Sequence, residues 1–293
     1  MTRAYSATPI RLAFALGLAA MILAACTAPP PPATQQARPA SITGAEGVVA
    51  KNPISTFTQF PVGLTWDWQL DGPRDLTRDV DVLALDYEDT TASEIAGLKA
   101  RGVRTICYVS VGSWEEWRDD AKDFPPDVLG KSLPEWPGER YVDMRRLDVL
   151  LPVMAARFAK CAEKGFDAIE PDNMGAYDND TGFGMNSEDL IAYMRGLIAE
   201  AHDLGLAMGQ KNAIEMVPAL AGVMDFMISE QCYQYRECDA LSHYLALGKA
   251  VFNAEYIESG TDFDAACAKS RALGIATILK TRDLNRIGQA CPG

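Results

Sequence analysis

Short apolar runs and longer amphipathic segments follow one another along the chain in a regular order. Eight apolar runs of strand length are predicted, at residues 64–70, 80–86, 104–112, 166–172, 206–212, 226–232, 250–256 and 275–281. Between most of them lie helix-like segments, several ending in the glycine expected just past a helix, at 91–102, 147–165, 186–205, 214–222 and 263–274. Strand and helix alternating in this way predict one α/β domain, a (β/α)₈ TIM barrel.

Two of the connections depart from this regular order. Residues 71–79 are too few for a full crossover helix, so the first helix is expected to be reduced or replaced by a turn. Residues 113–146, after the third strand, form a long segment rich in Pro and Trp with no clear periodicity. Long loops after barrel strands belong to the rim where active sites are built, so this loop is expected to border the site.

The first 55 residues have the composition of a targeting segment and a linker. Two arginines precede an apolar run that ends in small residues before Cys26, which predicts a secretory signal over residues 1–25 rather than a membrane span. The sequence "LAAC" resembles a bacterial lipobox, which implies a lipid anchor at Cys26 and a membrane-attached protein of the cell envelope. Residues 26–55 are predicted to be a Pro-rich tether and 56–293 the folded domain. An ordinary cleaved signal, with Cys26 incidental, is the alternative.

The cysteine count fits an oxidising compartment. Setting Cys26 aside leaves six of the seven cysteines, enough for three disulfides. No C-x-x-C motif occurs and the chain has only two histidines, so neither a metal site nor a cofactor is expected. Six cysteines allow fifteen pairings, which the sequence does not decide; those we favour are Cys107–Cys161, Cys232–Cys238 and Cys267–Cys291.

The charge of the chain is strongly negative. The formal net charge is −13, and removing residues 1–25, which hold two arginines and no acid, leaves −15. Such a chain repels nucleic acid and favours a cationic partner. The remaining length of about 240 residues suits one barrel domain, and we expect a monomer.

Every predicted strand ends in polar residues, where a barrel has its active face. Residues two apart on a strand share a face, so Glu170 and Asp172 should point into one space. Carboxylates mixed with Trp and Tyr, without a phosphate loop or a Ser-His-Asp set, are typical of a carbohydrate site. The candidate substrate-binding residues are Asp67, Gln69, Asp86, Tyr108, Trp114, Glu170, Asn173, Tyr177, Lys211, Asn212, Tyr233 and Glu255.

Five blocks, "CYVSVGSWEEWRDD", "GFDAIEPDNMGAYDNDTGF", "GQKNAIE", "SEQCYQYREC" and "VFNAEY", resemble in order the signature blocks of glycoside hydrolase family 114, the endo-α-1,4-polygalactosaminidases. The resemblance runs from about Trp66 to Lys280. It implies that Asp172, in "EPDN", and Glu230, in "EQC", are the catalytic pair. Gly175 stands where an acid is expected in this family, which leaves one substrate contact unassigned.

Glycoside cleavage needs one carboxylic acid and one carboxylate, and the strands that carry Asp172 and Glu230 flank the one that carries Lys211. We expect Asp172 to be the nucleophile and Glu230 the acid/base of a retaining reaction, with Lys211 holding a neighbouring carboxylate ionised. The expected substrate is a cationic galactosamine polymer, with Glu255 or Asp67 pairing with a sugar ammonium.

Two other functions fit the same sequence. One is a non-catalytic lipoprotein that binds an envelope polysaccharide, and the other is an endo-glycosidase of the same fold that acts on a neutral glycan. A separation beyond about 10 Å between the carboxyls of Asp172 and Glu230 would favour binding over hydrolysis.

Overall fold

The computed structural model describes residues 57–292 of the chain. The predicted signal, the lipidation site Cys26 and the tether therefore lie outside the described residues. All eight predicted strands are present, each within its predicted run: β1 (Trp66–Gln69), β2 (Val82–Asp86), β3 (Arg104–Ser110), β7 (Ala168–Asp172), β8 (Ala207–Lys211), β9 (Phe226–Glu230), β10 (Val251–Tyr256) and β11 (Ala276–Lys280). Neighbours in this order pair in parallel, so the predicted α/β barrel is confirmed.

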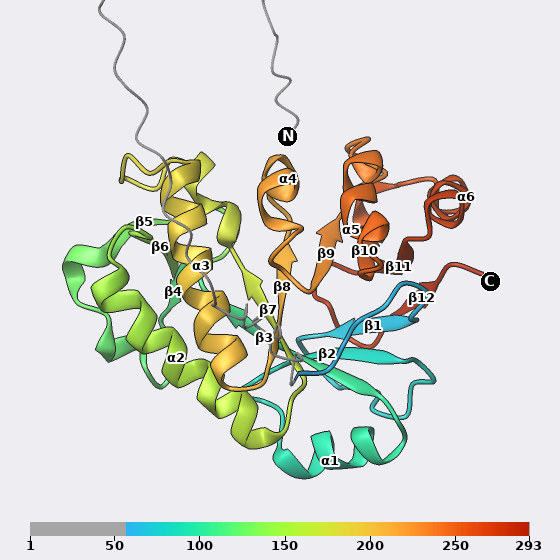
Figure 1. Ribbon diagram of the computed structural model, residues 1–293, viewed down its shortest axis with the longest axis horizontal. Coiled ribbons are helices and arrows are strands. Elements are labelled where there is room, and N and C mark those ends of the chain that lie inside the picture. Colours follow the sequence, from blue (N-terminus) through green and yellow to red (C-terminus); the bar gives the residue numbers. More distant parts are fainter. Residues whose placement is uncertain (1–56, 293) are drawn as a thin grey trace, which may run out of the picture. The chain divides into compact units, whose positions relative to one another are not determined.

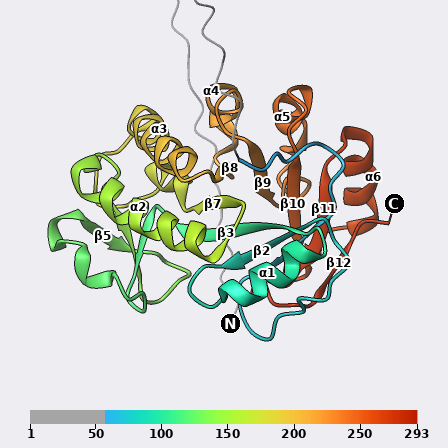
Figure 2. The same cartoon turned by 60° about the horizontal axis from the view of Figure 1, so that its bottom comes forward.

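The helices lie on the outer side of the strands (Figure 1; Figure 2). They are α1 (Ala92–Ala100), α2 (Leu147–Lys164), α3 (Ser187–Asp203), α4 (Val217–Leu220), α5 (Ser242–Ala246) and α6 (Phe263–Leu273). The short α5 was not predicted. Residues 70–81 form turns and bends instead of a helix, as their length predicts. Helix ends follow local chemistry: Asn186 and Asp189 form a capping box at the start of α3, and α2 ends at Gly165, whose φ of 90° favours glycine.

The barrel sheet is not fully closed. The short strand β12 (Gly288–Ala290) pairs antiparallel with β11 on the edge that β1 would occupy in a closed barrel. Side chains join β1 to β11 instead: the Trp66 indole donates to the carbonyl of Ala276 at 2.9 Å, and Lys280 Nζ lies 2.9 Å from Asp67 Oδ1. The described domain is therefore a nearly closed barrel with a side-chain seam.

The long loop after β3 forms an antiparallel sheet of its own, in the order β4-β6-β5, from β4 (Ser113–Glu115), β5 (Leu129–Ser132) and β6 (Glu139–Val142). We call residues 113–142 the small sheet. Its two ends meet where the Val142 N–H donates to the carbonyl of Gly112 at 3.2 Å. A Cβ on Gly112 would lie 1.9 Å from the carbonyl oxygen of Asn173, so only glycine lets this loop lie against the end of β7.

Two apolar layers hold the barrel together. One fills its interior and includes Trp66, Trp68 and Phe252; the other lies between strands and helices. The three favoured disulfides, Cys107–Cys161, Cys232–Cys238 and Cys267–Cys291, are all present. Within residues 57–292, no helix is both long and apolar enough to cross a membrane, and no group of three or more His, Cys, Asp or Glu side chains is arranged to hold a metal ion.

Candidate active site

Alternation along the parallel strands decides which polar residues meet inside the barrel mouth. Residues that continue the inward-facing rows beyond the apolar interior are Asp86 on β2, Tyr108 on β3, Asp172 on β7, Lys211 on β8, Glu230 on β9 and Tyr256 on β10. They line one cleft of about 1060 Å³ at the carboxyl ends of the strands. The cleft therefore lies on the face where barrel enzymes carry their active sites.

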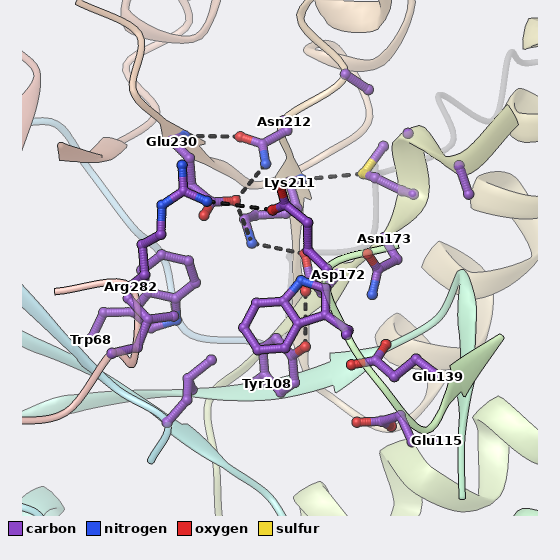
Figure 3. A pocket seen from close by; sticks show the side chains of 18 of the residues that line it. Trp68, Tyr108, Glu115, Glu139, Asp172, Asn173, Lys211, Asn212, Glu230 and Arg282 are labelled. Carbon is purple, nitrogen blue, oxygen red and sulfur yellow. Dashed lines mark hydrogen bonds and ion pairs between the residues drawn. The ribbon is translucent and has the colours of Figure 1, made fainter. Parts of the chain in front are cut away.

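Lys211 lies between two carboxylates at the centre of this cleft (Figure 3). Its Nζ is 2.8 Å from Asp172 Oδ1 and 3.0 Å from Glu230 Oε2. These two oxygens are therefore at most about 6 Å apart, the sum of the two distances. This is well below the separation of about 10 Å beyond which binding would be favoured over hydrolysis. The predicted strand arrangement, with Lys211 between the two acids, is the one observed.

Further hydrogen bonds fix both carboxylates. The Tyr108 hydroxyl donates to Asp172 Oδ2 at 2.8 Å. Glu230 accepts a hydrogen bond from the Tyr256 hydroxyl on one oxygen and from the Asn212 amide, at 2.6 Å, on the other. The Glu230 N–H in turn donates to the Asn212 side-chain oxygen at 2.8 Å. Each acid therefore has donors on both of its oxygens, which limits its rotation.

Each of the three central residues is followed by a residue in the left-handed backbone region. The φ angles are 60° at Asn173, 47° at Asn212 and 57° at Gln231. Such angles are uncommon outside glycine and gather at active sites, where they turn the chain sharply. Here the sharp turns end the strands directly after Asp172, Lys211 and Glu230. These three side chains therefore lie in the cleft, and the backbone that follows turns away from it.

The surroundings set the charge of Asp172. Burial by itself raises the pKa of Asp172, but the Lys211 ammonium, the Tyr108 hydroxyl and the Asn173 N–H outweigh it and hold that pKa below its ordinary value of 3.8. Burial by itself lowers the pKa of Lys211, but its acidic neighbours, Asp172 first, outweigh this and raise that pKa well above its usual range. Asp172 is therefore a carboxylate and Lys211 an ammonium at neutral pH.

Glu170 lies beneath this pair, fully buried inside the barrel. Its Oε1 is 3.4 Å from Lys211 Nζ, so it shares a space with Asp172, as the strand alternation predicts, and it would pair with Lys211 only when ionised. Burial, followed by the charges of Asp172 and Glu230, raises its pKa to about 8 despite Lys211. Glu170 is mainly protonated at neutral pH and supports the site from below.

Glu170→Gln should change how stability depends on pH. Between its unfolded pKa of 4.5 and its folded pKa of about 8, Glu170 is ionised in the unfolded chain and protonated in the folded one, so the wild type loses stability as pH rises. The variant has no such loss. Its free energy of unfolding relative to the wild type should therefore rise from pH 4.5 to pH 7 by up to about 3 kcal/mol. Denaturant unfolding at both pH values measures this; parallel pH profiles would contradict the assignment.

Three predicted contacts lie outside the cleft. Asp67 and Gln69 are on the outward face of β1, where Asp67 pairs with Lys280 at 2.9 Å and Arg78 at 3.2 Å. Glu255 is fully buried on the outward face of β10 and accepts the Tyr233 N–H at 2.9 Å. The expectation that Asp67 or Glu255 meets a sugar ammonium is therefore wrong, because Trp68 and Tyr256 take the inward positions.

Three predicted aromatic contacts are also placed differently. Trp114 packs against the core and its indole donates to the carbonyl of Ala121 at 2.9 Å. Tyr177 donates to Glu215, and Tyr233 packs on the core; neither lines the cleft. The tryptophans that line it are Trp68, beneath Lys211, and Trp117 and Trp136, which are about half exposed.

The other predicted contacts, Asp86, Tyr108, Asn173, Lys211 and Asn212, line the cleft. Asp86 is held by both terminal nitrogens of Arg118, at 2.9 and 2.6 Å, so its charge is already paired. Lining residues that sequence reasoning missed include Trp136, Glu139, Tyr256 and Arg282. Strand alternation could have found Tyr256, which shares the inward row of Phe252 and Ala254.

Acidic side chains dominate the cleft wall. Twelve aspartates and glutamates line it, against three basic residues, Arg118, Lys211 and Arg282. Arg118 and Lys211 are already paired with carboxylates. The cleft therefore carries a net negative charge, and its aromatic side chains offer flat apolar faces beside it.

Comparison with solved structures places this fold among carbohydrate enzymes. Ega3 of Aspergillus fumigatus, in complex with galactosamine, is 32% identical with a TM-score of 0.75, over 80% of this chain and 97% of that one. The glycoside hydrolase domain of PelA from Pseudomonas aeruginosa, 16% identical, has the same fold, with a TM-score of 0.62 over 78% of this chain and 99% of that domain.

Among curated protein sequences, none matches this chain. The model of glycoside-hydrolase family GH114, by contrast, matches residues 48–293, which include every residue of the cleft. The chain is therefore a glycoside hydrolase and belongs to family GH114.

Proposed function

We propose that this glycoside hydrolase cleaves α-1,4-linked, galactosamine-containing polysaccharide at internal bonds, with Asp172 and Glu230 as the catalytic pair. The observation that carries the proposal is the placement of both carboxylates on one buried ammonium, at 2.8 and 3.0 Å from Lys211. The similarity to Ega3, a structure in complex with galactosamine, supports the sugar. The open cleft supports internal cleavage, since it extends beyond the pair to Trp117 and Trp136.

The ionised state of Asp172 supports the assignment of the two chemical roles. Asp172 is ionised, so it cannot donate a proton and serves as the nucleophile that attacks the anomeric carbon. Glu230 gives a proton to the glycosidic oxygen as the bond to that oxygen breaks, and a glycosyl ester on Asp172 remains. Water then adds to the anomeric carbon, its proton passes to the Glu230 carboxylate, and Asp172 is released.

The separation of the two acids favours retention of configuration. Retaining enzymes place their carboxyls about 5 to 5.5 Å apart, and inverting enzymes leave about 6.5 to 9.5 Å for a water molecule. The oxygens that share Lys211 are at most about 6 Å apart, a spacing nearer to that of retaining enzymes, which supports retention. Proton NMR of the first product released would show whether its anomeric form matches that of the substrate.

The charge of the cleft supports a polymer that carries free amines. A wall with twelve acidic and three basic side chains attracts a cationic chain and gives a fully acetylated chain no such advantage. Salt weakens this attraction, because the screening length falls from about 30 Å at 0.01 M to about 8 Å at physiological ionic strength.

The test is incubation of the protein with a panel of purified polysaccharides that includes deacetylated and acetylated galactosamine polymers and a neutral glucan. We expect oligosaccharides from the deacetylated polymer, with a kcat/KM that falls as salt is added, and slower, salt-independent cleavage of the acetylated one. Release from the glucan alone would overturn the proposed substrate. Equal, salt-independent rates on both galactosamine polymers would overturn its electrostatic part.

A further inference from the structure

We propose that Glu139 binds the ammonium group of the sugar held beside Asp172, and that this contact sets the preference for deacetylated polymer. The inference rests on the proposed function and names a residue for it. Glu139 comes from β6 of the small sheet rather than from the barrel, lines the cleft and is only 6% exposed. Figure 3 shows its carboxyl group on the same side of the cleft as Asn173.

A chain of hydrogen bonds holds Glu139 relative to the end of β7. The Ser113 hydroxyl donates to Glu139 Oε2 at 2.6 Å and lies 2.6 Å from the Ser110 hydroxyl. The Asn173 amide donates to both serines, at 2.9 and 3.2 Å. Asn173 directly follows Asp172, so the network fixes Glu139 beside the sugar that Asp172 attacks.

Glu139 differs from the buried and half-buried acids near it in the cleft in having no cation of the described residues within ion-pair distance. Asp86 and Glu115 pair with Arg118, and Asp172 and Glu230 pair with Lys211. Within residues 57–292, no lysine or arginine forms an ion pair with Glu139. Burial, with the charges of Glu115 and Asp172, raises its pKa to about 7 although Ser113 donates to it. The charge of Arg118 lowers that pKa from beyond ion-pair distance, so this carboxylate has no positive partner in contact with it in the described part of the chain.

An ammonium on the substrate would supply that partner. It brings a charge and three donors to a carboxylate whose Oε1 makes no hydrogen bond within the described residues, and charge-assisted hydrogen bonds of this kind are the strong ones. An N-acetyl group brings one neutral donor and more bulk. The Ser113 hydroxyl cannot replace Glu139 as acceptor for a charge, because it is neutral and already receives the Asn173 amide.

The test is Glu139→Gln, which keeps the shape and removes the charge, compared with the wild type on deacetylated and partly acetylated polymers. We expect kcat/KM on the deacetylated polymer to fall about 10-fold or more, the usual effect of losing a hydrogen bond to a charged group, and the partly acetylated polymer to lose much less. An unchanged ratio between the two polymers would overturn the inference.

Glu116→Gln is the matched control, because Glu116 belongs to the same small sheet and carries the same charge but is exposed and outside the cleft. Its ratio should equal that of the wild type. Glu139→Asp keeps the charge, so it should retain part of the preference for deacetylated polymer. Circular dichroism checks that this variant is folded. A loss of preference equal to that in Glu139→Gln would contradict the ammonium contact.

A binding measurement separates this contact from the chemistry. NMR titration of galactosamine and N-acetylgalactosamine against the wild type and Glu139→Gln should show weaker binding of galactosamine alone in the variant. If the wild type cleaved no galactosamine polymer, the proposed function would fail; if it did and Glu139→Gln kept the same preference, only the role of Glu139 would fail.

Discussion

Asp172→Asn and Glu230→Gln should each lower kcat on the galactosamine polymer by at least ~10²-fold while leaving the fold intact. In the proposed mechanism, asparagine removes the charge that attacks the anomeric carbon, and glutamine removes the transferable proton. Both substitutions keep the size of the side chain. Neither substitution removes the residues that contact these side chains. Tyr108 and Lys211 still lie beside position 172, and Asn212 still lies beside position 230. Reducing-end assays and circular dichroism measure the two effects.

The two variants should differ from each other on a substrate with a good leaving group. Such a group departs without protonation, so Glu230→Gln should recover much of its rate in the first step, whereas Asp172→Asn should not. Asp180→Asn is the control, because Asp180 is exposed and its one ion pair among residues 57–292 is with Lys131 on the surface. Full activity in either active-site variant, or recovery by Asp172→Asn instead, would contradict the roles proposed.

Lys211→Met should lower both stability and activity. Lys211 is the ammonium shared by Glu170, Asp172 and Glu230, and its side chain is 3% exposed. Removing one member of a buried charge cluster typically costs about 3 to 5 kcal/mol, because the remaining charges lose their partner. The rate should fall by at least ~10²-fold, since Asp172 would no longer be held ionised.

The stability deficit of Lys211→Met should shrink in acid. The lowered pKa of Asp172 contributes stability above pH 3.8 that is lost as pH falls through the folded pKa. The variant lacks this contribution, so the two unfolding curves should approach each other below about pH 4. Lys131→Met, at an exposed ion pair, should change stability by less than about 0.5 kcal/mol. A Lys211→Met protein as stable as the wild type at pH 7 would refute the cluster's role.

The strand pattern predicted the barrel well because both faces of its strands are largely buried and the runs are bounded by clear turns. The same property hid which residues face inward. On β1, Trp66 and Trp68 alternate with Asp67 and Gln69, and all four are buried, so burial alone does not tell the inward row from the outward one. The contact between Lys280 and Asp67 shows that Asp67 is in the outward row. The two residues are 213 positions apart in the sequence, so the sequence alone does not reveal this contact.

The small sheet was beyond sequence reasoning for a different reason. Its strands have three or four residues each, too short to show alternation, and Glu139 follows Trp136 and Gly138 in what reads as a loop. The proposed catalytic pair was easier to find, because Asp172 and Glu230 each stand at the last position of a buried strand. The positions of Asp172 and Glu230 could therefore be predicted from the long barrel strands. The short strands of the small sheet, which shape the cleft, could be identified only from the structure.

The meeting of the two ends of the small sheet, where Val142 bonds to Gly112, has a consequence for how such enzymes diversify. A segment that leaves and rejoins the barrel at one point can be lengthened, shortened or exchanged without moving the strands that carry Asp172 and Glu230. Glu139, Trp117 and Trp136 all belong to that segment. Enzymes that share one barrel could therefore differ in the polymer they bind by differing in the small sheet alone. The barrel residues proposed to break the glycosidic bond would stay the same.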